Sequence, residues 1–281
     1  MSLKDILAFA VSLEADAAVL AAAEGLTQRF DADLTLAQLT LLPEEPLAYE
    51  PGLVAGVWAH LLGAAREEAK AEQQRINAHL QAQAGRKHLR ALEAQPRDLG
   101  RMAALHARYC DLAILARPDS EALRGMRFEM IEGVLLQSGR PALIIPPGWP
   151  GARPIGRRPM IAWDTSREAV RALAEAGSFL DVCEEAIIVT VDAKPKTFGH
   201  GPYPGANIAA HLERRGTQTE IRNLATDSEG VAGALLTAAR ECGADLIVMG
   251  AFGQSPLMEL MFGGATRDVL IRAEIPLLLA H

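Results

Sequence analysis

The chain has 281 residues, 49% of them hydrophobic and 22% charged, and a formal net charge of −7. This length suffices for two ordinary domains, and the composition is that of a soluble globular protein. Residues 1–150 carry 15 basic and 19 acidic side chains and residues 151–281 carry 13 and 16, so a nucleic-acid partner is not expected. No long uncharged apolar run predicts a membrane span, and the acidic N-terminus does not fit a secretory signal.

The cysteines and histidines indicate neither a metal site nor a disulfide framework. Cys110, Cys183 and Cys242 are far apart and include no CxxC pair, which is typical of buried thiols in a reducing cytoplasm. The seven histidines are scattered without a His-x3-His pair, so zinc is not expected. The sequence also lacks a Walker motif and a Gly-x-Ser-x-Gly elbow. We therefore expect a cytoplasmic protein without a resident metal.

The first half begins with an apolar strand-like run at residues 6–10. A helical stretch at 15–30 and a β-rich run at 34–42 follow it. Residues 53–80 then predict a long exposed helix with one apolar face. The charges at 66–75 could serve a partner, but a solvated face with local ion pairs is the preferred interpretation.

The second half follows a stretch from 148 to 159 that is rich in Gly, Pro and Arg. This stretch predicts a linker at 148–157, between domains at 1–147 and 158–281. Short apolar runs alternate with helical patterns beyond it. The predicted strands lie near 159–163, 186–191, 219–224, 245–249 and 275–279. The predicted helices lie near 166–180, 205–215, 228–242 and 265–273.

The two halves resemble each other at both ends. CDLAILARP at 110–118 matches ADLIVMGAF at 244–252, and SGRPALIIPP at 138–147 matches AEIPLLLAH at 273–281. An internal duplication is therefore expected. Alternating strands and helices predict an α/β fold made of two tandem open parallel sheets with right-handed crossovers. The last strands, 142–145 and 277–280, are expected to join the halves as in a dimer of single-domain relatives.

Glycines mark the most informative segment of the chain, residues 244–281. Gly250 and Gly253 follow a strand, and the pair Gly263 and Gly264 precedes a helix. Glycine lets the backbone approach a ligand, and free N–H groups at a helix start attract anions. Asp164 also follows a strand, and ligands of open parallel sheets bind beyond the carboxyl ends of strands. These features predict a site for a phosphate-bearing molecule, although glycines that serve only the turn geometry remain an alternative.

The same residues resemble the universal stress proteins. Nucleotide-binding members of that family carry Gly-x2-Gly-x9-Gly followed by Ser or Thr, and Gly250, Gly253 and Gly263 match this spacing. The next residue is Gly264, so the hydroxyl is lost and weaker binding is expected. Asp164-Thr165-Ser166 resembles the family's Asp-Gly-Ser, and Val191 matches a valine that ends its second strand. The resemblance implies a Rossmann-like fold of the adenine nucleotide alpha hydrolase type.

The resemblance also implies a nucleotide site in the second half. Asp164 and the backbone around Ala162 and Val191 would hold adenine and ribose, while the residues after Gly263 would present N–H groups to phosphate. The ligand would be ATP or another adenine nucleotide, with Mg²⁺ as a further candidate. The expected binding residues are Ala162, Asp164, Thr165, Val191, Gly250, Ala251, Gly253, Gly263, Gly264, Ala265 and Thr266.

The first half departs from the family pattern. Ala10 is aligned with Asp164, and Ala116-Arg117-Pro118-Asp119 replaces the Gly-x2-Gly turn. Gly133 is aligned with Gly263, and the carboxylate of Glu132 before it would repel phosphate. This half is expected to have lost the site and kept the fold. A less charged ligand is the alternative.

Other features leave the function open between three hypotheses. Glycines at 199, 201 and 205 do not follow a strand, so they predict a loop rather than a dinucleotide site; His200 and Tyr203 in it could cover the nucleotide. The chain is interpreted as a nucleotide-binding stress-response regulator, with a protein partner or homodimer as further expectations. A nucleotide-free interaction module and a slow ATPase are the alternatives. No motif places a general base, so efficient catalysis is not expected.

Overall fold

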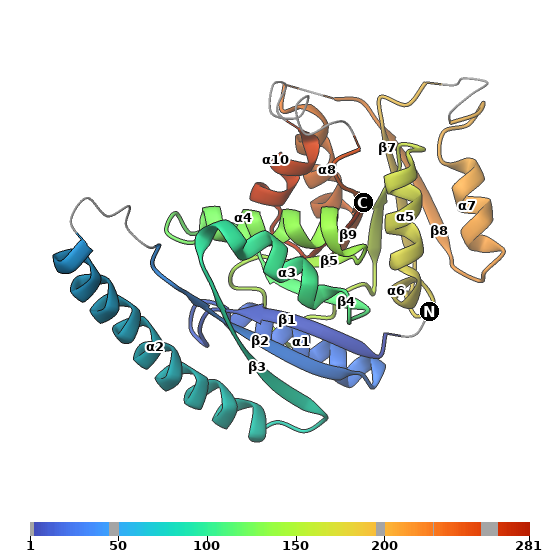
Figure 1. Ribbon diagram of the computed structural model, residues 1–281. Helices are drawn as coiled ribbons and strands as arrows, with labels where there is room; N and C mark the ends of the chain where they lie inside the picture. The colour runs from blue at the N-terminus through green and yellow to red at the C-terminus, as the bar shows by residue number, and fades with distance from the viewer. Residues whose placement is uncertain (1–2, 45–50, 195–199, 227, 254–263) are drawn as a thin grey trace.

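The computed structural model describes residues 3–44, 51–194, 200–226, 228–253 and 264–281. Ten strands form one continuous sheet in the order β3-β2-β1-β4-β5-β10-β9-β6-β7-β8 (Figure 1). The strands are β1 (Asp5–Ala10), β2 (Asp33–Leu41), β3 (Lys87–Ala94), β4 (Leu112–Ala116), β5 (Ala142–Ile145), β6 (Pro159–Ala162), β7 (Ala186–Val191), β8 (Thr219–Leu224), β9 (Leu246–Gly250) and β10 (Leu277–Ala280). Each half contributes five parallel strands with the same internal order, as the predicted duplication requires.

Helices cover both faces of this sheet. They are α1 (Ala17–Phe30), α2 (Pro51–Gln81), α3 (Leu99–Ala107), α4 (Arg124–Gly133), α5 (Arg167–Glu175), α6 (Gly177–Leu180), α7 (Ala206–Glu213), α8 (Gly230–Glu241) and α10 (Ala265–Arg272). Every strand predicted in the second half is confirmed, and so are the helices that begin near 166, 205, 228 and 265. Among the described segments, no helix is both long and apolar enough to cross a membrane.

The two halves meet through their last strands. β5 and β10 pair antiparallel, with Leu278 opposite Leu143, and this confirms the predicted joint. All residues of both strands are buried. The pairing satisfies the backbone groups that a sheet edge would otherwise leave open, so two five-stranded units become one ten-stranded sheet.

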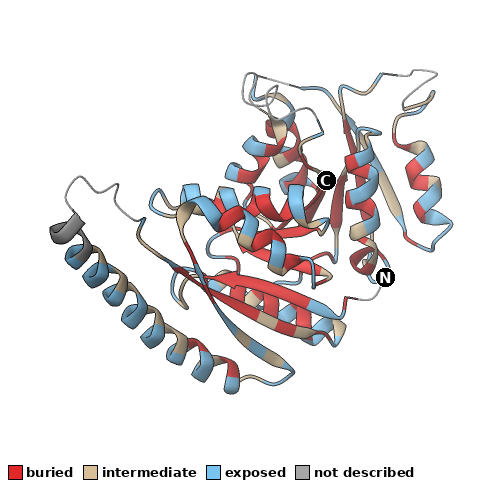
Figure 2. Ribbon diagram, viewed as in Figure 1, coloured by how far each residue is buried: buried red, intermediate tan, exposed pale blue. Residues whose placement is uncertain are grey.

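Two hydrophobic cores lie on opposite faces of the sheet, and each runs through both halves (Figure 2). Successive strand residues point to opposite faces, so Leu278 joins one core while Leu277 and Leu279 join the other. Helices α1, α5, α6 and α7 pack on the first face, and α3, α4, α8 and α10 pack on the second. Because both faces are covered, the central strands read as nearly continuous apolar runs.

A repeated carboxylate fixes the alignment of the halves. Asp111 accepts hydrogen bonds from the backbone N–H groups of Lys4 (2.8 Å) and Asp5 (3.1 Å), and Asp245 accepts equivalent bonds from residues 157 (2.9 Å) and 158 (3.0 Å). Counting forward from these pairs places Val11 opposite Asp164. The predicted equivalence of Ala10 and Asp164 is therefore wrong by one residue. Because Val11 is also uncharged, the first half still lacks that carboxylate.

The long helix α2 is confirmed, but between residues 56 and 81 its apolar face is fully buried only near the C-terminal end. Ile76 is fully buried and Leu80 is 5% exposed, whereas Leu61 is 51% exposed. The charged stretch forms a local ion pair, as predicted, with Arg75 2.7 Å from Glu72, and also a pair with another element, with Arg66 2.8 Å from Glu93 of β3. The C-terminal end of α2 is buried because it reaches the first core through Ile76 and Leu80.

Candidate functional site

A cavity of about 690 Å³ opens at the carboxyl edge of the second half. It lies beyond the ends of β6, β7 and β9, where α5, α8 and α10 begin. The strand order reverses between β6 and β9, since β7 and β8 lie on one side and β10 on the other. Such a switch point is where open parallel sheets bind ligands. The volume falls within the range of small-molecule sites.

Asp164 is held at the mouth of this cavity by the turn that follows β6. Its Oδ1 accepts hydrogen bonds from the backbone N–H (2.9 Å) and the hydroxyl (2.6 Å) of Ser166. The Ser166 hydroxyl oxygen in turn accepts from the N–H of Ala169 (3.1 Å) and caps α5. The cap therefore fixes the carboxylate relative to the helix, while Asp164 itself stays exposed.

Three strained turns surround the cavity. Thr165, Asp192 and Phe252 have φ angles of 69°, 49° and 54°, and they follow β6, β7 and β9 respectively. Non-glycine residues rarely adopt this left-handed conformation, and a β-branched residue such as Thr165 does so at the greatest cost. The backbone N–H and the hydroxyl of Thr226 both donate hydrogen bonds to the carboxylate of Asp192 and stabilise one of the turns. Strain of this kind is concentrated at functional sites.

Gly250 permits close packing as well as lining the cavity. A Cβ atom at this position would lie 2.6 Å from the backbone nitrogen of Ala169, so β9 and the start of α5 could not approach each other as they do. A Cβ at Gly253 would lie 3.2 Å from the carboxylate of Glu168. Close packing alone is therefore enough to explain a glycine at position 250. A role in ligand binding is supported only by the cavity that Gly250 lines.

The start of α10 offers backbone donors to the same space. Gly264 is the N-cap and gives no side-chain cap, while Gly264, Ala265 and Thr266 all line the cavity. The first amides of a helix have no acceptors within the helix, and the helix dipole favours an anion there. This end of α10 can therefore accept one anionic group through its backbone.

The structure brings together most of the predicted binding residues. The cavity lining includes Ala162, Asp164, Val191, Gly250, Gly253, Gly264, Ala265 and Thr266. Thr165 instead lines a neighbouring hollow of about 260 Å³ with Trp163 and His200. Ala251 is fully buried, and its N–H donates to the carbonyl of Ala280 (2.9 Å). Gly263 lies outside the described residues.

Sequence reasoning missed the acidic side chains of the cavity. Besides Asp164, the lining contains Glu168 at the start of α5, Glu229 just before α8 and Asp268 in the first turn of α10. Among the described lining residues there is no Lys, Arg or His. Acidic residues are common at helix N-termini for electrostatic reasons alone, so no sequence pattern indicated that these carboxylates would share one cavity. Trp163 is half-buried, packs against the first core and borders the cavity.

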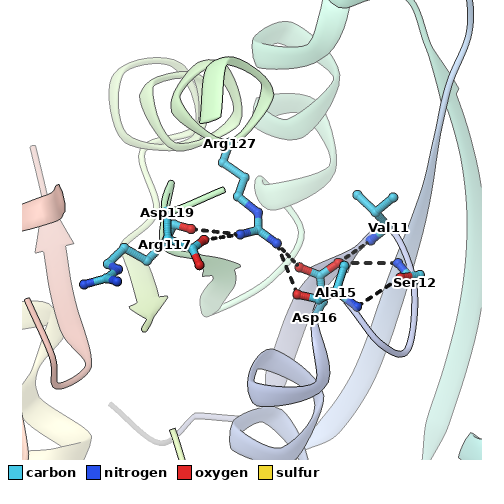
Figure 3. Close-up of polar contacts among 7 residues, drawn as sticks. All are labelled: Val11, Ser12, Ala15, Asp16, Arg117, Asp119 and Arg127. Carbon is cyan, nitrogen blue, oxygen red and sulfur yellow. Dashed lines mark hydrogen bonds and ion pairs between the residues drawn. The ribbon is translucent and has the colours of Figure 1, made fainter. Parts of the chain in front are cut away.

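The equivalent place in the first half is filled. Only about 20 Å³ remains between the ends of β1, β2 and β4 and helix α4. The guanidinium of Arg127 lies 2.9 Å from Asp16 and 2.5 Å from Asp119, and it also donates to the carbonyl oxygens of Ala15 and Arg117 (Figure 3). The side chains of Arg127 and Asp16 are 8% and 3% exposed. An internal ion pair thus fills the space that is open in the second half.

Asp16 is held by backbone groups as well as by Arg127. Its Oδ2 accepts from the N–H groups of Val11 (2.6 Å) and Ser12 (3.4 Å). Burial raises the pKa of Asp16, and these backbone bonds and the charge of Arg127 oppose that effect. A buried carboxylate with so many donors is a structural group, because its lone pairs are already committed.

Gly133 has a different role from the one predicted. It lies at the end of α4, and a Cβ atom there would lie 2.1 Å from the carbonyl oxygen of Gly100 in α3. The predicted equivalence with Gly263, and the repulsion of phosphate by Glu132, are therefore wrong. The glycine pair lets helices α3 and α4 touch, and Glu132 belongs to the last turn of α4. The first half lacks an open site because Arg127 and Asp16 fill the equivalent space.

These features define a class of protein: an open α/β sheet with a ligand-sized cavity at a switch point. Comparison with known families is consistent with that class, since residues 157–281 match the universal stress protein family. This part of the chain is a universal stress protein domain, in agreement with the resemblance in its sequence. A comparison with curated protein sequences gives no match.

Solved structures that cover nearly the whole chain support the same fold. A universal stress protein from Archaeoglobus fulgidus DSM 4304 is 16% identical, with 98% of this chain and 95% of that one covered and a TM-score of 0.74. A functionally unknown protein from Pseudomonas aeruginosa PAO1 is 16% identical, with coverages of 99% and 92% and a TM-score of 0.53. A universal stress protein in complex with cAMP is 23% identical, covering 44% of this chain and 96% of its own, with a TM-score of 0.35. The full-length match is consistent with a tandem arrangement.

Proposed function

We propose that this protein is a regulatory protein that binds an adenine nucleotide in its second half. The observation that carries the proposal is the cavity of about 690 Å³ at the β6–β9 switch point, within a universal stress protein domain. Its lining combines apolar surface from Val191 and Met249 with the carboxylate of Asp164 and the start of α10. An apolar pocket with a few placed polar groups suits a base and ribose.

The roles of the lining residues follow from their chemistry. The carboxylate of Asp164, exposed at the mouth, can accept hydrogen bonds from ribose hydroxyls. The backbone amides at Ala265 and Thr266 can donate to a phosphate. Mg²⁺ could accompany the phosphate, because carboxylates of the lining are the ligands that it prefers.

The organisation proposed for the chain assigns the two halves different tasks. Residues 1–147 form a domain whose site is filled by Arg127, residues 148–157 a linker, and residues 158–281 the nucleotide-binding domain. The shared sheet would let the first domain support the second as a partner subunit would. Nucleotide occupancy would then act as a signal to a protein partner in stressed, cytoplasmic conditions.

Titration calorimetry with AMP and ATP tests the proposal. Wild type should release heat with a 1:1 stoichiometry, and Asp164→Ala should weaken the ribose contact and lower the affinity about tenfold. Asp98→Ala is the matched control, since Asp98 is an exposed aspartate of the first half. Absence of heat at millimolar nucleotide, with and without Mg²⁺, would refute the proposal.

A nucleotide-free interaction module is the second candidate. It is favoured by Gly264, which lacks the family's hydroxyl, and by the filled site in the first half. A nucleotide released from the purified protein by heat denaturation would argue against it. Slow ATP hydrolysis is a third candidate, and it predicts phosphate release that disappears in Asp164→Ala.

A further inference from the structure

We infer that the second-half cavity selects adenine ligands that carry little phosphate charge, a nucleoside or a monophosphate, over a metal-free triphosphate. The inference rests on the proposed function and narrows the class of ligand. Its basis is the charge of the lining. Four carboxylates border the cavity, and no cationic side chain does so among the described lining residues.

Two of the four carboxylates form ion pairs with described residues, and the other two do not. Glu168 lies 3.5 Å from the guanidinium of Arg167, whose side chain is 96% exposed, and Glu229 pairs with Arg272. The bonds of the Asp164 side chain go to Ser166, which is neutral. Asp268 forms no ion pair with any described residue. The net charge at the lining is therefore negative.

The sequence that links β9 to α10 adds no cationic side chain. Between Ala251 and Thr266 the sequence contains one glutamate and no Lys, Arg or His. The first cation beyond it, Arg267, lies with its guanidinium carbon 5.2 Å from the ring centroid of Phe128 in α4. That arginine is thus engaged by the first half and is not among the lining residues.

Among the described lining residues, the donors left for phosphate are the backbone amides at the starts of α8 and α10 and the hydroxyl of Thr266. The start of α10 can hold one phosphate through Ala265 and Thr266, where the helix dipole offsets part of its charge. Each further phosphate adds negative charge near Asp268 and Glu168. Like charges in a partly desolvated site repel more strongly than in water. The carboxylates of the lining could help to hold a divalent cation, whose charge would offset that of the phosphates and reduce the affinity difference between AMP and ATP.

Calorimetry with adenosine, AMP, ADP and ATP in EDTA at low ionic strength tests this selectivity. ATP should bind at least about tenfold more weakly than AMP, equivalent to about 1.4 kcal/mol. Added NaCl should strengthen ATP binding, because salt screens repulsion, whereas a site built from Lys or Arg would lose affinity. Mg²⁺ should reduce the difference in affinity between AMP and ATP.

Variants that replace one carboxylate by an amide test whether the charge of the lining causes the selectivity. Asp268→Asn and Glu168→Gln should each strengthen ATP binding about three- to tenfold in EDTA and change AMP binding less. Glu184→Gln, an exposed glutamate that pairs with Arg157, is the control and should change neither. Equal or tighter binding of ATP than AMP in EDTA, or equal effects of all three variants, would overturn the inference while leaving the proposed function intact. Absence of binding by every ligand would overturn both.

Discussion

Replacing Arg127 tests whether the ion pair that fills the ligand-equivalent space of the first half stabilises the fold. In Arg127→Met the carboxylate of Asp16, 3% exposed, loses a guanidinium at 2.9 Å and keeps only neutral donors. Breaking a buried pair by removing one partner costs about 3–5 kcal/mol. This is a large share of a typical folding free energy of about 5–15 kcal/mol. The free energy of unfolding at pH 7, from urea titration followed by circular dichroism, should fall by that amount.

Two further variants separate charge from packing. Arg66→Met removes an exposed pair whose side chains are 52% and 44% exposed, so it should lower the free energy of unfolding far less than Arg127→Met does. The double variant Asp16→Asn with Arg127→Met should recover more than half of the loss. The reason is that an amide oxygen still accepts from Val11 and carries no charge.

The pH dependence of the loss has a definite sign. Burial already raises the pKa of Asp16 above its ordinary value of 3.8, and removing the opposing charge of Arg127 raises it further. The folded variant therefore keeps a proton on Asp16 to higher pH than wild type does. The deficit should be smallest below pH 3.8 and should grow as the pH rises through the pKa values of Asp16 in the two proteins. A deficit equal to that of Arg66→Met, or one that shrinks as the pH rises, would refute the reasoning.

Three other variants test the backbone strain at Thr165 and the close packing at Gly250 and Gly133. Thr165→Gly should raise the free energy of unfolding by about 0.5–1 kcal/mol in urea titration, because Thr165 has a φ of 69° that glycine adopts more easily. A decrease would contradict the claim that the backbone is strained at this position. Gly250→Ala should lower the free energy of unfolding by about 1–3 kcal/mol and weaken nucleotide binding in calorimetry, because the new Cβ would lie 2.6 Å from the backbone nitrogen of Ala169. The matched control is Gly63→Ala on α2, where a Cβ would have nothing within 4 Å and should not destabilise the protein. Gly133→Ala should lower the melting temperature by separating α3 from α4 and leave nucleotide affinity unchanged, and altered affinity with unchanged stability would restore the binding role.

The architecture was predictable because its signals are local and repeated. The buried strands are short apolar runs, as in Leu246–Gly250 and Leu277–Ala280, and they recur at matching places in both halves. The similar last strands indicated a dimer-like joint, and the pairing of β5 with β10 confirms it. A sheet buried on both faces demands such runs, so composition along the chain is enough to find them.

The alignment of the two halves was less secure. Ala10 and Gly133 were assigned by similarity of short stretches, and both assignments failed. A slip of one residue, from Ala10 to Val11, leaves an apolar pattern nearly unchanged, whereas the bonds of Asp111 and Asp245 fix the register. Gly133 owes its identity to Gly100, a residue of another helix. Contacts between distant segments leave no local pattern in the sequence.

The sequence by itself determined the class of fold, the duplication and the edge of the sheet where a ligand would bind. These depend on hydrophobic periodicity and on turn residues, which act over a few positions. Only the tertiary structure decided which half has space for a ligand and what charge that space has. Arg127 meets Asp16 across 111 positions, and Asp164, Glu168, Glu229 and Asp268 come from three helix starts and a strand end. Volume and electrostatic potential are sums over such distant groups, so they arise only when the chain is folded.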